Sequence, residues 1–327
     1  MTLRELNRTL LQRQLLLARV RIPPQKAVER LVALQAQYAP SPYVALWSRL
    51  EGFRKEQLTR ALAVGSIVKA GSLRLTLHVM TRREFPYLAA ACIEAYRNRA
   101  EGRRIDIDAL RAAIPDRPLT SAELFELGHR VLETDDRWTV AFAFRSLAFT
   151  RTEPVGAWPH TKPSAAVLWR DALPDARESA IRVVRAYLAG YGPATRDDIQ
   201  QYTGFRLGQI DPALDGLRDL GDGLYDLPRA RLAGGDERAP VRFLPAFDSI
   251  ILAHRDRSRI VPSEYIEAVF NKRNATTRNT FTVDGFVAGA WRIDGRRLVV
   301  EPFAPLPLRV RQELDAEGER LLAWYLG

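Results

Sequence analysis

Runs of helical sequence that end in short alternating segments recur along this chain. Helical spacing predicts helices over residues 6–20, 25–38, 43–50 and 55–64, and residues 66–80 then alternate as two short strands do. Three or more helices closed by a β-hairpin is the order of a winged helix. The sequence therefore predicts a first winged-helix unit over residues 1–80.

Two later helix starts share one pattern, which indicates that the unit is repeated. Pro118-x-Thr120-x-x-Glu123-Leu124 and Pro193-x-Thr195-x-x-Asp198-Ile199 each combine a proline, a capping threonine, an acidic third position and an aliphatic next position. The second start leads into a turn at Gly204 and a further helix, which is typical of a helix–turn–helix. We therefore predict a second unit over residues 81–175 and a third over residues 176–232.

The last part of the chain, residues 233–327, is rich in predicted strands. Strands are expected over 241–253, 280–293 and 297–303, with Asp284-Gly285 as a hairpin turn, before a closing amphipathic helix over 308–326. The predicted fold class is α+β and mainly helical, with three tandem winged-helix units in a concave arrangement and a β-rich C-terminal part.

The charge balance favours a polyanionic partner. The 327 residues carry 49 Lys and Arg against 39 Asp and Glu, a formal net charge of +10. Such a balance is common in proteins that bind nucleic acid. No apolar run approaches the length of a membrane span, and the amino terminus has no hydrophobic signal core. We therefore expect no membrane partner and a cytoplasmic, nucleoid-associated protein.

Few residues in the sequence could support metal or cofactor chemistry. Cys92 is the single cysteine, the four histidines are scattered, and no Walker pattern or nucleophile-elbow motif occurs. The sequence predicts no metal, no cofactor and no nucleotide cofactor.

A pair of glutamines interrupts a strongly apolar stretch. Residues 28–38 follow the spacing of a buried helical stripe, and Gln35 falls in the middle of that stripe. Gln37 would point away from Gln35 in a regular helix, but Pro40 and Pro42 are expected to loosen the last turn. Two neutral amides at a helix end could then face one cleft. The alternative is that Gln35 pairs with buried backbone groups.

Several motifs in a fixed order carry a resemblance to a known family. They are Gln35-Ala36-Gln37, Arg74-Leu-Thr-Leu-His78, Leu244-Pro-Ala-Phe-Asp248, His254-Arg-Asp-Arg257, and Val283-Asp-Gly285 followed by Gly289-Ala-Trp291. Together they resemble the AlkZ-like family of winged-helix DNA glycosylases, over essentially the whole chain. That family uses the glutamine pair at its active site, and some branches carry Asp at the second position. With Gln at both positions, this sequence is similar to the branch that unhooks bulky alkylated purines and interstrand crosslinks in antibiotic producers.

The resemblance implies roles for two groups of residues. The implied catalytic residues are Gln35 and Gln37, with Gln37 orienting the attacking water through its carbonyl and Gln35 holding that water, or the sugar and phosphate, in place. The implied or candidate DNA-binding residues are Arg74, His78, His254, Arg257, Lys272, Arg273 and Arg278. His78 could equally be a structural histidine, and the last three could be solvated charge. Asp248 and Asp256 are expected to be structural partners of Arg257 or of neighbouring arginines rather than an acid–base pair.

The implied reaction is simple hydrolysis of the N-glycosidic bond in double-stranded DNA that contains a bulky alkylated guanine. An N7-alkylated purine is positively charged and leaves readily, so a side chain that positions water is sufficient and no Schiff-base lysine is needed. Two non-enzymatic alternatives remain open: a winged-helix regulator that binds DNA, and a module that binds another protein. For a repair enzyme that wraps one lesion, a monomer is expected.

Overall fold

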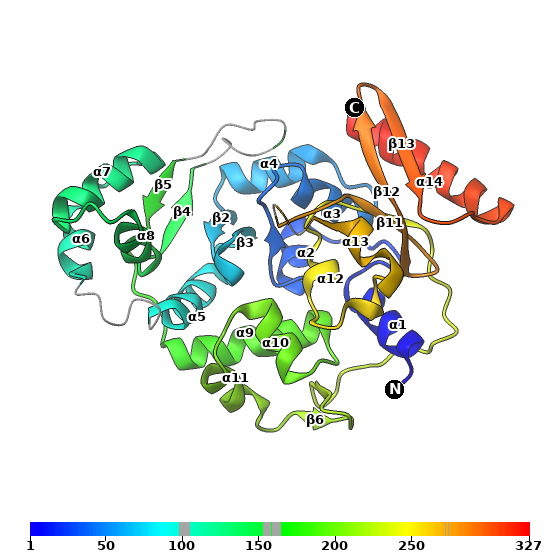
Figure 1. Cartoon of the computed structure of the whole chain (residues 1–327), viewed down its shortest axis with the longest axis horizontal. Coiled ribbons are helices and arrows are strands. Elements are labelled where there is room, and N and C mark those ends of the chain that lie inside the picture. Colours follow the sequence, from blue (N-terminus) through cyan, green and yellow to red (C-terminus); the bar gives the residue numbers. More distant parts are fainter. Residues whose placement is uncertain (98–104, 153–157, 159–164, 272, 274) are drawn as a thin grey trace.

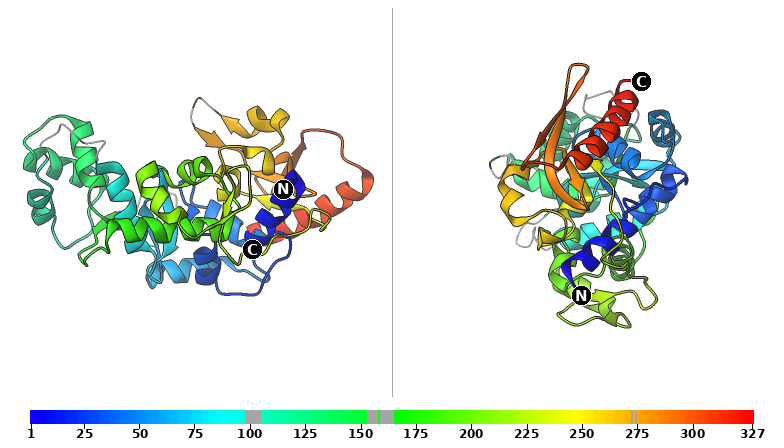
Figure 2. Two further views of the ribbon diagram at one scale, coloured as in Figure 1. Left: turned by 90° about the horizontal axis from the view of Figure 1, so that it is seen from below. Right: turned by 90° about the vertical axis from the view of Figure 1, so that its right-hand side faces the viewer.

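The computed structural model describes residues 1–97, 105–152, 158, 165–271, 273 and 275–327. The described chain combines α-helices with antiparallel sheets, which places it in the α+β class. Helices α6–α8 lie at one end of the molecule, and the strands β12 and β13 lie with the last helix, α14, at the opposite end (Figure 1). The long axis between these ends is also evident from below (Figure 2).

The first part of the chain packs four helices against a small hairpin. The elements are α1 (Leu3–Arg13), α2 (Pro24–Arg30), β1 (Leu34–Gln35), α3 (Ser41–Arg49), α4 (Lys55–Ala63), β2 (Ile67–Gly71) and β3 (Leu77–Thr81). The predicted hairpin over residues 66–80 is confirmed as β2 and β3, which pair from Ile67↔Thr81 to Gly71↔Leu77. The strand β1 adds to the other side of β3.

The helix predicted over residues 25–38 is wrong in its second half. Helix α2 ends at Arg30, Val32 takes a left-handed conformation with φ +66°, and the chain then enters β1. The cause is a tertiary pairing, because Leu34 and Gln35 pair with Val79 and His78 of β3. Gln35 therefore lies on a strand rather than on a helical stripe.

The second part of the chain contributes a helix, a three-helix lobe and two strands. They are α5 (Phe85–Arg97), α6 (Ile107–Ala113), α7 (Ser121–Val131), α8 (Arg137–Arg145), β4 (Phe149–Arg151) and β5 (Ala166–Leu168). A five-stranded sheet in the order β1-β3-β2-β4-β5 joins this part to the first through the bridge Ala70↔Thr150. The two parts are thus connected by backbone hydrogen bonds as well as by the chain.

The third part is helical with a minimal hairpin. It contains α9 (Ala176–Tyr191), α10 (Arg196–Thr203), α11 (Leu207–Leu214), β6 (Arg218–Asp219) and β7 (Tyr225–Asp226). Thr195 and Asp198 form the predicted capping box, and Gly204 ends α10 in the left-handed conformation that glycine adopts without strain. The helix–turn–helix predicted here is confirmed, although α11 ends at Leu214 rather than Leu220.

The C-terminal part holds a four-stranded antiparallel sheet in the order β13-β12-β11-β8. Its elements are β8 (Arg242–Leu244), α12 (Ser249–Leu252), α13 (Ile266–Val269), β9 (Phe270–Asn271), β10 (Thr276–Thr277), β11 (Thr280–Val283), β12 (Phe286–Asp294), β13 (Arg297–Pro302) and α14 (Leu308–Leu326). The strand predicted over residues 241–253 is much shorter than expected, because Asp248 caps the short helix α12 inside that range. Within the described residues, no helix combines the length and apolar character needed to cross a bilayer.

Candidate active site

The glutamine pair lies at the edge of the five-stranded sheet. Gln35 pairs with His78, and the Ala36 amide donates to the Leu77 carbonyl oxygen at 2.7 Å, so strand-like pairing extends to the residue before Gln37. Gln35 is buried with 6 % exposure, whereas Gln37 is exposed. One edge strand therefore presents one amide to the interior and one to the surface.

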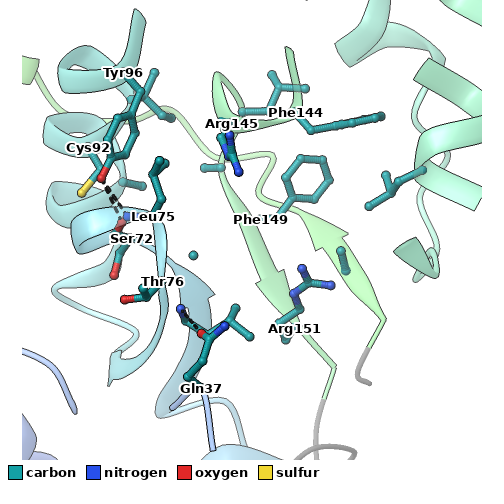
Figure 3. A pocket seen from close by; sticks show the side chains of 18 residues that line it. Gln37, Ser72, Leu75, Thr76, Cys92, Tyr96, Phe144, Arg145, Phe149 and Arg151 are labelled. Carbon is teal, nitrogen blue, oxygen red and sulfur yellow. Dashed lines mark hydrogen bonds between the residues drawn. The ribbon is translucent and has the colours of Figure 1, made fainter. Parts of the chain in front are cut away.

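Gln37 is held by the neighbouring strand and borders a cavity. The Leu77 backbone N–H donates to Gln37 Oε1 at 3.1 Å, which leaves one lone pair of that oxygen for another donor. A cavity of about 290 Å³ has Gln37 in its wall together with side chains from α5, α8 and β4 (Figure 3). An amide with a fixed carbonyl at a cavity wall can orient a bound water molecule.

Gln35 is oriented by an arginine from the turn between β2 and β3. Arg74 Nη2 donates to Gln35 Oε1 at 3.3 Å, and Arg74 Nη1 donates to the Tyr202 carbonyl oxygen. The guanidinium carbon lies 5.1 Å from the centre of the Tyr202 ring, within cation–π range. Burial lowers the pKa of Arg74, but arginine stays charged at neutral pH. Arg74 thereby directs the amide N–H groups of Gln35 away from itself.

The turn that carries Arg74 has an unusual backbone. Arg74 and Leu75 have φ values of +53° and +60°, a region that non-glycine residues occupy rarely and at a cost in energy. The Tyr96 hydroxyl accepts a hydrogen bond from the Leu75 amide at 2.9 Å and so supports this conformation. The turn directs Arg74 toward Gln35 and leaves Leu75 in the wall of the cavity that Gln37 borders.

The two histidines predicted to contact DNA are buried, and this part of the prediction is corrected. His78 is fully buried, and its Nδ1 lies 3.1 Å from both Ser72 Oγ and the Thr76 carbonyl oxygen. Burial, with a smaller contribution from the Arg74 charge, lowers the pKa of His78 to about 3. His78 is therefore a neutral structural histidine, one of the two roles that the sequence allows.

His254 is buried in the same way beneath the third part of the chain. Its Nε2 lies 3.1 Å from the Tyr191 carbonyl oxygen, and burial followed by the Arg259 charge lowers its pKa to about 3. The prediction failed because spacing along the chain does not reveal that α9 and α10 cover this segment. Neither histidine reaches the protein surface.

The remaining predicted DNA-binding residues lie on the C-terminal part. Arg257 is half-buried with its guanidinium carbon 4.3 Å from the centre of the Phe270 ring. Arg273 and Arg278 are exposed, and both border an open hollow beside the β9–β10 hairpin. Arg278 also forms a surface ion pair with Glu301. Lys272 lies outside the described residues.

Hydrogen bonds between side chains and the backbone connect the β9–β10 hairpin to the segment that follows the glutamines. Ser41 Oγ, at the start of α3, donates to the Ala246 carbonyl oxygen at 2.7 Å, and the Phe247 amide donates to Thr277 Oγ1 at 2.6 Å. These two hydrogen bonds, through the neighbouring residues Ala246 and Phe247, join the start of α3 to the β9–β10 hairpin.

The two aspartates that could have suggested acid–base chemistry are structural. Asp248 forms a bidentate pair with Arg49 at 2.8 and 2.9 Å, and both side chains are fully buried. Asp256 accepts a hydrogen bond from the Ser258 amide at 2.9 Å. The structural role predicted for Asp248 is confirmed, with Arg49 rather than Arg257 as its partner.

The sequence analysis missed the far wall of the cavity. Phe144, Arg145, Phe149 and Arg151 all border the cavity, and they come from the end of α8 and from β4. The available signal was the group of aromatic residues and arginines within residues 142–151, to which the sequence analysis assigned no role. The cavity itself depends on the pairing of β2 with β4 and is not visible in the sequence.

These features agree with a comparison against known families. The chain matches the AlkZ-like DNA glycosylase family over residues 28–324 and belongs to that family. It is therefore a DNA glycosylase, and its substrate is DNA.

Individual relatives are consistent with this assignment. The chain is 24 % identical over 341 residues to the interstrand DNA cross-link repair glycosylase of Streptomyces sahachiroi, covering 90 % of this chain and 88 % of the relative. The solved structure of the Streptomyces sahachiroi DNA glycosylase AlkZ has the same fold. The two structures superpose with a TM-score of 0.79 and 21 % identity over 99 % of this chain and 97 % of the other.

Proposed function

We propose that this enzyme hydrolyses the N-glycosidic bond of bulky N7-alkylated purines in double-stranded DNA and unhooks interstrand crosslinks that pass through such purines. The observation that carries the proposal is Gln37, an exposed amide whose carbonyl is held by Leu77 at the wall of a cavity. The name of the Streptomyces relative supports the crosslink part of the proposal. The biological role that we propose for this activity is DNA repair or self-resistance to a genotoxic natural product.

The chemistry suits an amide because the substrate has a good leaving group. Alkylation at N7 places a positive charge on the purine, so the C1′–N9 bond breaks with its electron pair moving to the base, which becomes neutral. Water adds to C1′ and loses its proton to solvent. The free lone pair of Gln37 Oε1 accepts a hydrogen bond from that water and so aims the water oxygen at C1′. The reaction involves no covalent intermediate with the protein.

Gln35 acts in this proposal as a donor. Because its Oε1 accepts from Arg74, its N–H groups are the part of the amide that remains for the water, the sugar or a phosphate oxygen. Arg74 is then a positioning residue for Gln35, a role that its contacts favour over the direct DNA contact predicted from the sequence.

The scaffold that brings DNA to this site is part of the same proposal. We propose three tandem winged-helix units in a concave arrangement, because in three places helices are followed by antiparallel strands: β2–β3, β4–β5 and β6–β7. The proposed unit boundaries are those predicted from the sequence. Arg273 and Arg278, with Lys272 and Arg257, are the proposed phosphate contacts. We propose that the enzyme acts as a monomer on cytoplasmic DNA.

The first test measures base excision by glutamine variants. Wild-type enzyme is incubated with a duplex that contains one N7-alkylguanine carrying an aromatic mustard arm, and abasic sites are then cleaved with alkali. Gln37→Ala is expected to lower the single-turnover rate about 100-fold and Gln35→Ala about 10-fold, because each loses one positioning contact in the transition state. Gln12→Ala, which changes an exposed glutamine on α1, is the matched control and should retain wild-type activity.

Two results would contradict the mechanism. Full activity in Gln37→Ala would remove the amide from the reaction. Capture of a protein–DNA adduct by borohydride would show a Schiff-base intermediate instead of simple hydrolysis. A protein that binds DNA tightly and excises no alkylated purine at all would be a regulator, the alternative that the sequence left open.

A further inference from the structure

The cavity beside Gln37 has two unlike walls. Gln37, Ser72 and Thr76 supply polar groups from the first part of the chain, whereas Phe144 and Phe149 supply aromatic surface from the second. The two phenylalanine rings meet edge to face, with centres 6.0 Å apart and planes at 66°. Figure 3 shows the polar groups and these rings on opposite sides of the space. An apolar group that enters beside Gln37 would rest against the two rings.

The charge of the cavity is positive. Arg145 and Arg151 border it, and within the described residues its lining contains no Asp or Glu. Arg145 contacts no carboxylate in the described part of the chain, and its guanidinium carbon lies 5.4 Å from the centre of the Phe142 ring. Burial lowers the pKa of Arg151, yet its guanidinium remains charged at neutral pH. Partly buried guanidinium groups favour a ligand that offers carbonyl or carboxylate oxygens.

The size of the cavity limits what it can hold. Its volume of about 290 Å³ is close to the lower end of small-molecule sites, which begin near about 300 Å³. One or two rings fill it. In an N7-alkylated guanine the substituent projects from the imidazole ring away from the sugar, so the purine can lie outside the cavity while a flexible substituent reaches into it.

We propose that this cavity binds the substituent of the alkylated purine, and that it selects planar aromatic substituents that carry a carbonyl or carboxylate acceptor. The inference rests on the proposed function and specifies its substrate class. Phe144 and Phe149 contact the ring, and Arg145 binds the acceptor. The purine itself remains outside the cavity, on the DNA side of Gln37.

A glycine in the cavity wall provides a direct test. Gly71 ends β2 and borders the cavity, its φ is not positive, and a Cβ atom built on it would meet no atom within 4 Å. Gly71→Leu therefore adds a bulky side chain at the cavity wall, and its Cβ atom meets no neighbouring atom. Gly208→Leu is the matched control, because Gly208 is an exposed glycine with the same open surroundings and lies away from this cavity.

The substrates are two duplexes that differ only in the N7 substituent of one guanine. One carries the arm of an aromatic mustard that ends in a phenylbutanoate, and the other carries the compact arm of an N-methyl aliphatic mustard. We expect Gly71→Leu to lower the excision rate of the aromatic adduct at least tenfold and that of the aliphatic adduct less than twofold. Gly208→Leu should change neither rate.

Other outcomes overturn the inference in distinguishable ways. An equal loss for both adducts, with undamaged-DNA affinity retained, would place the purine rather than its substituent in the cavity. No loss for either adduct would mean that the cavity is not used. If the wild-type enzyme excised neither adduct, the proposed function itself would fail and this inference with it.

A second variant tests the acceptor without changing the shape of the cavity. Arg145→Met keeps a long side chain and removes the charge. The wild-type enzyme is expected to excise the phenylbutanoate adduct faster than the matching methylamide adduct, and Arg145→Met should reduce this preference severalfold. An unchanged ratio would exclude Arg145 from acceptor binding, and the proposed selection for an acceptor would be wrong.

Discussion

Arg74 determines which atoms of Gln35 can act on a ligand. It bonds the amide oxygen of Gln35 on one side and the Tyr202 carbonyl on the other, from a backbone with positive φ. Such a conformation persists only where surrounding contacts maintain it, and the hydroxyl of Tyr96 supplies one of them. The left-handed turn is therefore best explained as the means of fixing one amide.

Arg74→Met should separate orientation from binding. Without its donors, the Gln35 amide can rotate, and we expect the single-turnover excision rate to fall about 10- to 100-fold, as misplaced catalytic groups typically cause. The dissociation constant for lesion-containing DNA should change less than about threefold, and Arg74→Lys should restore part of the rate. Arg255→Met is the control. Arg255 is an exposed arginine, and it borders a surface hollow beside α10 that Arg74 also borders. A large loss of affinity at an unchanged rate would instead assign Arg74 to DNA binding.

At the residue scale the sequence identified unusual side chains but not their surroundings. Gln35 and Gln37 were recognisable as polar residues in an apolar stretch, but Pro40 was expected to loosen only the last turn of a helix that in fact ends at Arg30. The strand that carries Gln35 depends on pairing with residues about forty positions later, which local spacing cannot predict. The burial of His78 and His254 was hidden for the same reason.

Between elements, a fully buried ion pair joins α3 to α12. Arg49 and Asp248 form a bidentate pair with both side chains fully buried, and Arg49 Nη1 also donates to the Ala45 carbonyl oxygen at 3.0 Å. Asp248 in addition accepts from the Ile250 amide at 3.1 Å and so caps α12. This pair connects the helix after the glutamines to the C-terminal part of the chain.

Asp248→Ala is expected to lower the free energy of unfolding by about 3–5 kcal/mol, because it leaves the Arg49 charge buried without its partner. Chemical denaturation at pH 7.5 measures the change. Glu301→Gln, which removes the exposed pair with Arg278, is the control and should leave the free energy of unfolding almost unchanged. A loss in Asp248→Ala as small as that of the control would show that water or a rearranged carboxylate compensates for Asp248.

Helices that begin with a capping box, and the hairpin with an Asp-Gly turn, were predicted correctly. The capping boxes at Thr120 and Thr195 begin α7 and α10 as expected, and Asp284-Gly285 turns between β11 and β12. The four-residue helix α12 was predicted as strand, because so short a helix has no periodicity and depends on its cap.

At the scale of the whole molecule, the site lies where two parts of the chain share a sheet. The cavity wall draws on residues from Gln37 to Ala166, brought together by the order β1-β3-β2-β4-β5. The order of motifs along the chain was sufficient to indicate the family, and the family is confirmed. The cavity follows from non-local pairing and needed the structure.

The pH dependence of the excision rate tests whether catalysis depends on a titrating group, because the groups around Gln35 and Gln37 keep their charge state near neutral pH. His78, next to Gln35 in the sheet, has a pKa lowered to about 3 by burial and is neutral throughout the range above pH 6.5. Cys92, in the cavity wall, has a pKa raised to about 12 by burial and stays protonated below pH 9. Neither group changes charge between these limits, and the glutamines do not titrate.

The deciding measurement is the single-turnover rate of excision of an N7-alkylguanine between pH 6.5 and 9, corrected for spontaneous depurination. Hydrolysis directed by two amides predicts that the protein adds no rise in rate with pH, so the rate stays level or falls as the alkylated guanine loses its N1 proton and becomes a poorer leaving group. A rate that rises about tenfold per pH unit and then levels off would reveal a titrating general base. That result would contradict catalysis by Gln35 and Gln37 alone.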